Sequence, residues 1–204
     1  MTDGIEQRLQ LLDWRRRIAE LYAAVRGEGD AERAWHHWRD VRERMFLEHP
    51  QSPLPADRRT REHVPRYFDY DPSFRVLAGV VPTASDGALV PSSTGPDTEV
   101  TRAGTARLQL GGDDVELELH WLNDYAGGLL LMCRDATSGQ ETYGAGRYVL
   151  DTAKSADLGE RDGRIVVDFN FAYQPSCSYD PTWHCPLPPR ANWLSVPIRA
   201  GERL

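Results

Sequence analysis

The sequence predicts an α+β protein that is mainly β, with N-terminal helices packed on an antiparallel β-barrel or sandwich. Two observations carry this prediction. Apolar residues near the start of the chain recur at three- and four-residue steps, and later segments alternate apolar and polar residues between turn-forming residues. No helical pattern separates the later segments, which favours hairpins over the crossovers of a parallel sheet. We expect one structural unit, with a helical segment at 1–66 and a β domain at 67–204.

Two amphipathic helices are expected, at residues 5–26 and 30–48. Asp30 follows two glycines and suits the N-cap of the second helix, in which Trp35 and Trp38 belong to a buried stripe. The helical spacing also predicts a stripe on the first helix. That stripe comprises Ile5, Leu9, Leu12, Trp14, Ile18, Leu21, Tyr22 and Val25.

The β domain is expected to contain several short strands. The clearest covers 115–122, where Val115, Leu117 and Leu119 alternate with polar residues, and His120 is therefore expected on a solvent-facing side. The segment from Pro82 to Pro96 is expected to form a long surface loop. The other strands are expected at 74–81, 105–110, 129–133, 147–150, 164–169 and 194–199.

Composition excludes several classes of protein. Of the 204 residues, 40% are apolar and 27% are charged, which indicates a globular chain with a sizeable core. The net charge of −7 disfavours nucleic acid as a partner. No apolar run approaches the ~18 residues of a membrane span, and the first residues lack the pattern of a signal peptide. We expect a cytoplasmic protein without a membrane partner.

Unusual polar motifs lie between Asp135 and Glu202. They read DATSGQETYGAGRYVL and DFNFAYQPSCSYDPTWHCPLPPRANWLSVPIRAGE. This pattern resembles a family of bacterial and archaeal proteins defined only as a domain of unknown function, and the similarity extends nearly end to end. The resemblance implies a shared fold and a shared site without a known substrate. The family often has arginine where this chain has Phe171, and His184 lies outside the pattern, so no role is carried over to either position.

The first candidate site surrounds Arg147. Gly144 and Gly146 lack side chains that would block a ligand, and Arg147 can bind a carboxylate or phosphate through two hydrogen bonds. Tyr143 adds a phenol. The alternative is that the two glycines form a turn or bulge and that Arg147 pairs with Asp135 or Glu141.

The second candidate site surrounds Asp168. Alternation places Asp168 and Asn170 on the same side of a strand end, with Tyr173 close by. A carboxylate, an amide and a phenol could serve as general base, orienting group and proton donor. The alternative is that Asp168 and Asn170 bond backbone amides and tie the strand to its loop.

The cysteines offer a third kind of site. Cys177 and Cys185 bracket the sequence SYDPTWH, so redox, metal and nucleophile roles all need consideration. A zinc site is not expected, because the chain has no CxxC motif and only His184 lies nearby. A nucleophilic thiol needs an activating environment. We expect reduced, buried thiols, with a disulfide if the chain is exported or oxidised, and we expect Cys133 in the core.

Two functions follow from these candidates. In the first, a polar pocket binds a small, anionic molecule and acts on it without a redox cofactor or metal; the catalytic candidates are Asp168 and Tyr143, and the ligand-binding candidates are Arg147, Gly144, Gly146, Asn170, Tyr173 and Glu202. In the second, the protein is a non-catalytic binding or scaffold protein, and the same side chains form a structural hydrogen-bond network. A cavity shared by Arg147 and Asp168 would favour the first function.

Overall fold

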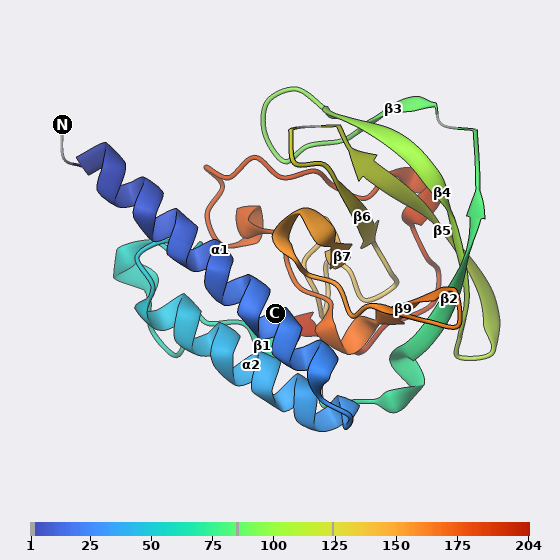
Figure 1. Ribbon diagram of the computed structural model, residues 1–204, viewed down its shortest axis with the longest axis horizontal. Coiled ribbons are helices and arrows are strands. Elements are labelled where there is room, and N and C mark those ends of the chain that lie inside the picture. Colours follow the sequence, from blue (N-terminus) through green and yellow to red (C-terminus); the bar gives the residue numbers. More distant parts are fainter. Residues whose placement is uncertain (1–2, 85, 124) are drawn as a thin grey trace.

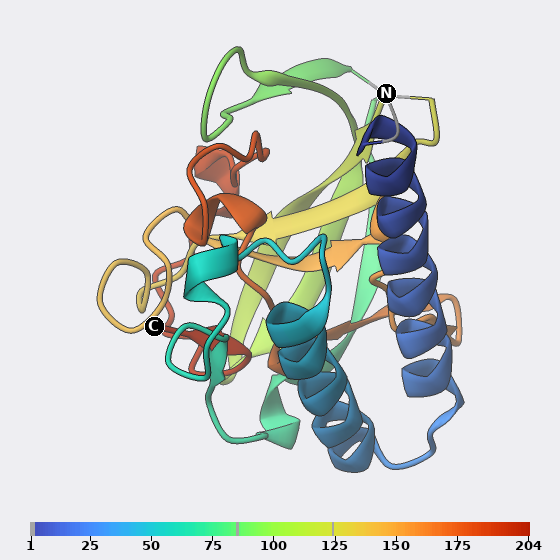
Figure 2. The ribbon, with the colours of Figure 1, turned by 90° about the vertical axis from the view of Figure 1, so that its left-hand side faces the viewer.

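The computed structural model describes residues 3–84, 86–123 and 125–204. Two helices, α1 (Asp3–Gly27) and α2 (Ala31–Glu48), open the chain and pack side by side against the β domain (Figures 1 and 2). The side chain of Asp30 caps α2 by accepting a hydrogen bond from the Arg33 amide at 3.0 Å. Both predicted helices are confirmed.

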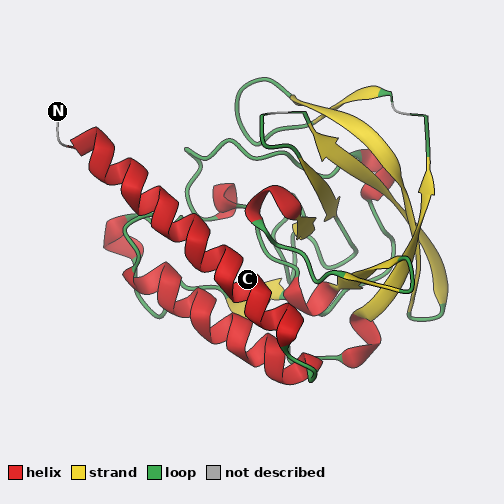
Figure 3. Ribbon diagram, viewed as in Figure 1, coloured by secondary structure: helices red, strands yellow, loops and turns green. Residues whose placement is uncertain are grey.

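One open antiparallel sheet forms the β domain (Figure 3). Its strands follow the spatial order β7-β6-β5-β4-β2-β9-β8, and β3 pairs with β4. The two ends of this path do not pair, so the sheet is sandwich-like and not a closed barrel. A separate small sheet joins β1 (Arg66–Tyr67) to β10 (Glu202–Arg203). The large sheet contains β2 (Arg75–Pro82), β3 (Gly87–Val90), β4 (Thr98–Leu110), β5 (Asp113–Leu122), β6 (Gly128–Cys133), β7 (Arg147–Asp151), β8 (Glu160–Arg161) and β9 (Arg164–Asp168).

Apolar side chains fill two cores, one on each side of the sheet. Leu130 and Met132 of β6 pack with Trp35 and Trp38 of α2 in the first core. The second core contains Leu117 and Leu119 of β5 and is completed by Ile198 and Ala200 near the C-terminus. Alternation along the strands therefore supplies both cores, as expected for a sheet buried on two sides.

The first half of α1 departs from the predicted buried stripe. Ile18, Leu21, Tyr22 and Val25 are buried, whereas Ile5, Leu9 and Leu12 are 57%, 57% and 51% exposed. The N-terminal turns of α1 extend beyond the body of the protein (Figure 1). The apolar residues there keep the helical spacing but have less of the protein to pack against. Across residues 3–84, 86–123 and 125–204, no helix combines the length and the apolar composition that a membrane span requires.

Two expected elements of the β domain are corrected by the structure. The expected loop from Pro82 to Pro96 contains β3, which pairs with β4 and buries Val90. The expected strand at 194–199 has no regular ladder, because the carbonyl of Ile198 accepts a hydrogen bond from the Arg147 side chain at 2.8 Å. Side-chain donors thus replace a neighbouring strand there.

His120 is a third correction. It is 1% exposed, not solvent-facing. Its β6 neighbour in the ladder is Leu130, which belongs to the core beneath the helices. His120 lies on the same buried side of the sheet as Leu130, and burial lowers the pKa of its imidazole.

Candidate functional site

The Arg147 guanidinium is held by protein groups on both of its terminal nitrogens. Nη2 donates to Asp135 Oδ2 at 3.0 Å and to the Ile198 carbonyl at 2.8 Å. Nη1 donates to the carbonyls of Ala200 and Glu202, the latter at 3.0 Å. Its side chain is 1% exposed. The structure therefore realises the alternative interpretation, in which Arg147 pairs with Asp135 and clamps the C-terminal segment.

Packing explains the glycine before Arg147. Gly146 has φ +100°, and a Cβ there would lie 2.6 Å from the Cys133 carbonyl oxygen and 2.7 Å from Pro188 Cγ. Gly146 is thus required by its protein neighbours, and its conformation gives no support to a ligand. Gly144 faces Gly139, whose Cα would lie 3.6 Å from an added Cβ.

Asp168 and Asn170 form a second network. Asp168 Oδ1 accepts hydrogen bonds from the Asn170 amide at 2.9 Å and from its side chain at 2.8 Å, while Oδ2 accepts from Arg75 at 2.9 Å. Asn170 also bonds the backbone of Asp71 in both directions. Burial raises the pKa of Asp168, and Arg75 opposes that shift. These bonds tie the end of β9 to the loop before β2.

Arg147 and Asp168 consequently have separate partners, which corrects the expectation that they face one cavity. Arg147 bonds Asp135 and the C-terminal carbonyls, and Asp168 bonds Arg75 and Asn170. Both charges are already compensated within the chain. Ion pairing of this kind offsets the cost of burying the two charges without a ligand, and it leaves Arg147 Nε buried without a hydrogen-bond partner.

Glu202 is the centre of a third network. Its Oε1 accepts a hydrogen bond from Arg42 of α2, whose Nε lies 3.1 Å away. Its Oε2 accepts from the backbone amide of Gln174 at 2.7 Å and from the Tyr179 hydroxyl at 2.9 Å. Arg42 also stacks on Tyr173, with 5.0 Å from the guanidinium carbon to the ring centroid. Glu202 thereby fixes both ends of the segment from Gln174 to Tyr179.

Cys177 lies in the middle of that segment and meets Tyr143 and Cys185. The Tyr143 hydroxyl is 3.8 Å from Cys177 Sγ, and Cys185 is the neighbour with the largest effect on the pKa of Cys177. We call Tyr143, Cys177 and Cys185 the thiol cluster. The structure thus brings one of the predicted catalytic residues to the two cysteines, and leaves Asp168 in another network.

Cys185 is positioned by backbone and side-chain bonds on the opposite side of the cluster. Its amide donates to Ser93 Oγ at 3.0 Å, and its carbonyl accepts from the Ser93 amide at 2.9 Å. The next carbonyl, of Pro186, accepts from the Tyr148 hydroxyl at 2.6 Å. Between the cysteines, residues 181–184 are exposed. Two fixed thiols therefore lie beneath a short exposed loop.

The three thiols have different acidities. Hydrogen bonding with Cys185, with further contributions from Ser93 and Tyr143, lowers the pKa of Cys177 to about 6 although only 8% of the residue is exposed. The same bond raises the pKa of Cys185. Burial in β6 raises the pKa of Cys133 to about 12, and burial likewise raises that of Tyr143 to about 12. The directions of these shifts make Cys177 the most acidic of the three thiols.

The described part of the chain places no three His, Cys, Asp or Glu side chains where they could hold a metal ion. We predict that freshly purified protein contains far less than one equivalent of zinc, measured by elemental analysis. One equivalent of zinc, lost together with the fold on chelation, would contradict this prediction.

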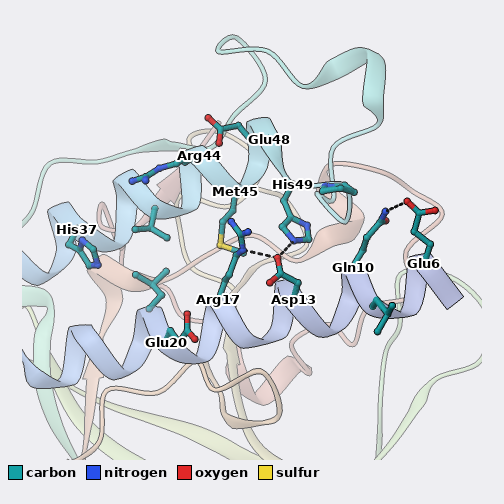
Figure 4. Close-up of a pocket in the computed structure, with 14 residues that line it drawn as sticks. Glu6, Gln10, Asp13, Arg17, Glu20, His37, Arg44, Met45, Glu48 and His49 are labelled. Atoms are coloured by element: carbon teal, nitrogen blue, oxygen red, sulfur yellow. Dashed lines mark hydrogen bonds and ion pairs between the residues drawn. The ribbon is translucent and has the colours of Figure 1, made fainter.

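The groove between α1 and α2 is a different kind of hollow, with a volume of about 760 Å³ (Figure 4). His49 and Asp13 meet there, with His49 Nε2 3.2 Å from Asp13 Oδ2. Hydrogen bonding by His49 lowers the pKa of Asp13. The other ring nitrogen, Nδ1, accepts from the Gln51 amide at 3.0 Å. With both nitrogens engaged, His49 is a structural residue and offers no free base.

Fold and site together define a small α+β protein with two helices on an open antiparallel sheet, three buried polar networks and a pair of adjacent thiols. The chain belongs to the family described as "Protein of unknown function (DUF1684)", whose model matches residues 63–203. It is similar to an uncharacterised protein of Haloarcula marismortui solved by solution NMR. That similarity has 36% identity and a TM-score of 0.60, and covers 81% of this chain and 90% of the other. A comparison with curated proteins gives no match.

Proposed function

We propose that the protein binds a small electrophilic molecule at the thiol cluster and that Cys177 is the group that bonds to it. One observation carries the proposal: the Tyr143 hydroxyl lies 3.8 Å from Cys177 Sγ, where its proton can stabilise a Cys177 thiolate. A thiolate is a nucleophile, so its partner is an electrophilic carbon or sulfur atom. Tyr143 keeps its proton and can donate it in a hydrogen bond to the bound molecule.

This proposal replaces the anionic ligand expected from Arg147. The Arg147 charge is neutralised by Asp135, and a thiolate repels an anion. The chemistry needs no redox cofactor. Two free thiols fit a reducing compartment, which supports a cytoplasmic location, and the net charge of −7 favours a small molecule over nucleic acid.

The polar residues of the family motifs support the second function, in which they form a structural hydrogen-bond network. Arg147, Asp168 and Asn170 bond the chain that surrounds them, as a structural network requires. We assign them to stability. Glu202 has a part in both functions. It belongs to a buried network, and it joins α2 to the segment that carries Cys177.

Alkylation by iodoacetamide tests the proposal. In the native protein, we expect the modification rate of Cys177 to rise with pH around a midpoint of about 6, because only the thiolate reacts. Cys133 is the internal control and should stay unmodified while the protein is folded, because it is buried in β6 with a pKa of about 12. Peptide mapping by mass spectrometry after timed quenching separates the sites.

Two variants sharpen this test. Tyr143→Phe removes one donor to Cys177 and should move the midpoint to higher pH, whereas Cys177→Ser should remove the fast reaction. Native Cys177 that reacts no faster than Cys133, or with a midpoint near the ordinary thiol pKa of ~8.5, would overturn the proposed function.

A further inference from the structure

The N-terminal half of α1 carries a second apolar stripe, on the face turned away from the body of the protein. Ile5, Leu9 and Leu12 are 57%, 57% and 51% exposed, whereas Ile18 is buried. Leu9 lies nine positions before Ile18, which is roughly two and a half turns of an α-helix, so the two side chains point in opposite directions. Figure 2 shows α1 along one edge of the molecule. The exposed stripe is therefore accessible to a partner.

The spacing of this stripe matches the seam of a coiled coil. Four and then three positions separate Ile5, Leu9 and Leu12, so these residues occupy positions d, a and d of a heptad. Arg16 follows at the next a position and Ala19 at the next d position. A second helix laid along this seam would cover the three apolar side chains.

Charged residues flank the stripe, with opposite signs on its two sides. Arg8 and Arg15 occupy g positions, and Asp13 and Glu20 occupy e positions. In a parallel pair of identical helices, each g residue lies beside the e residue of the next heptad in the other chain, so Arg8 meets the partner's Asp13 and Arg15 meets the partner's Glu20. In an antiparallel pair, g residues face g residues and e residues face e residues, so like charges would meet. The charges therefore favour a second copy of this chain in the parallel orientation.

Most of these charged groups are available for such pairs. Arg8, Arg15 and Glu20 are exposed, and none of them takes part in an ion pair within the described residues. Asp13 already pairs with Arg17 at 2.8 Å, but its carboxylate can accept from a second guanidinium. A partner helix therefore gains ion pairs without breaking any that hold the monomer together.

We infer that residues 5–20 of α1 form a parallel two-stranded coiled coil with the same segment of a second copy. Arg16 limits the number of strands to two, because its long side chain reaches water from the seam of a pair, whereas a larger bundle would enclose its charge. Three apolar side chains from each chain make a small interface, so we expect a reversible dimer with a micromolar dissociation constant. The interface lies outside residues 63–203, which the family model matches, and it does not depend on the proposed function.

Sedimentation equilibrium of the full chain tests the dimer. We expect the average mass of the wild type to rise from one chain to two between micromolar and millimolar concentrations. Leu9→Gln combined with Leu12→Gln should weaken association at least ~100-fold, because two leucines of each copy leave the interface. Leu204→Gln is the matched control, since Leu204 is 55% exposed but lies outside α1, and it should associate as the wild type does. Thermal melting of dilute samples checks that each variant is folded.

A charge reversal tests the orientation. Arg15→Glu places two carboxylates side by side at each contact with the partner's Glu20, and it should weaken association by roughly 10-fold. Adding Glu20→Arg to the same chain restores opposite charges at that contact and should return the dissociation constant to near the wild-type value. Such a rescue requires that positions 15 and 20 of different chains meet, as they do only in the parallel pair.

Four results would overturn the inference. The first is a wild type that stays monomeric at about 1 mM, because that concentration reveals even a millimolar dissociation constant. The second is association of the Leu9 and Leu12 double variant as tight as that of the wild type. The third is a mass of three or more chains, which contradicts the two-stranded seam. The fourth is an Arg15→Glu variant that associates at least as tightly as the wild type, which contradicts the parallel orientation.

Discussion

Arg147→Met should lower the free energy of unfolding by about 3–5 kcal/mol, the usual cost of breaking a buried ion pair from one side. The substitution leaves Asp135 Oδ2 without its guanidinium partner. It also removes the donors that hold the carbonyls of Ile198, Ala200 and Glu202. For a chain of this size, we expect the thermal midpoint to fall by on the order of 10 °C. Urea denaturation and calorimetry measure both quantities.

Arg199→Met is the matched control. Arg199 pairs with Glu141 at 2.9 Å, but the two side chains are 59% and 38% exposed. Solvent screens such a pair, so its loss should cost at most about 1 kcal/mol. Equal stability of Arg147→Met and the wild type would contradict the structural assignment of Arg147 and return it to the list of ligand-binding candidates.

The comparison of these two arginines shows what the sequence could predict. Three- and four-residue spacing predicts the helices, and alternation between turn residues predicts most strands, because each pattern depends on neighbours a few positions away. The backbone acceptors of Arg147 come instead from Ile198, Ala200 and Glu202, and the first two lie outside any regular strand. No local pattern shows that a side chain will take the place of a neighbouring strand. The same motif therefore suited a ligand site and a structural network equally well.

The thiol cluster was predicted only in part. The spacing of Cys177 and Cys185 in the sequence identified two thiols that a loop could bring together. Tyr143 was singled out for a different reason, its place beside two glycines, and its contact with Cys177 crosses 34 positions of the chain. Ser93 carried no signal, because it lies in a Ser- and Gly-rich segment expected to be a surface loop. The contacts that the sequence did not predict join residues far apart in the chain, so they depend on the tertiary fold.

Residue 201 shows how tightly that C-terminal segment is packed. Gly201 has φ +76°, and a Cβ there would meet the Ala172 carbonyl oxygen and lie 2.6 Å from the Phe169 carbonyl oxygen. Neither carbonyl is free to move away: the Ala172 oxygen accepts from the Glu202 amide at 2.8 Å, and the Phe169 oxygen accepts from the Ala172 amide at 2.9 Å. Displacing either one disturbs the chain around Glu202.

Gly201→Ala should therefore destabilise the protein far more than Gly163→Ala. Gly163 has a similar φ of +70°, but an added Cβ there meets nothing within 4 Å. The control measures the left-handed backbone strain alone, roughly 1–2 kcal/mol. At Gly201 the clash with two bonded carbonyls adds to that strain, and we expect a total loss above about 3 kcal/mol, within the range of severe core overpacking. Equal losses in urea denaturation would mean that the segment from Ala200 to Glu202 yields easily, and a segment that yields could not hold Glu202 rigidly against Gln174 and Tyr179.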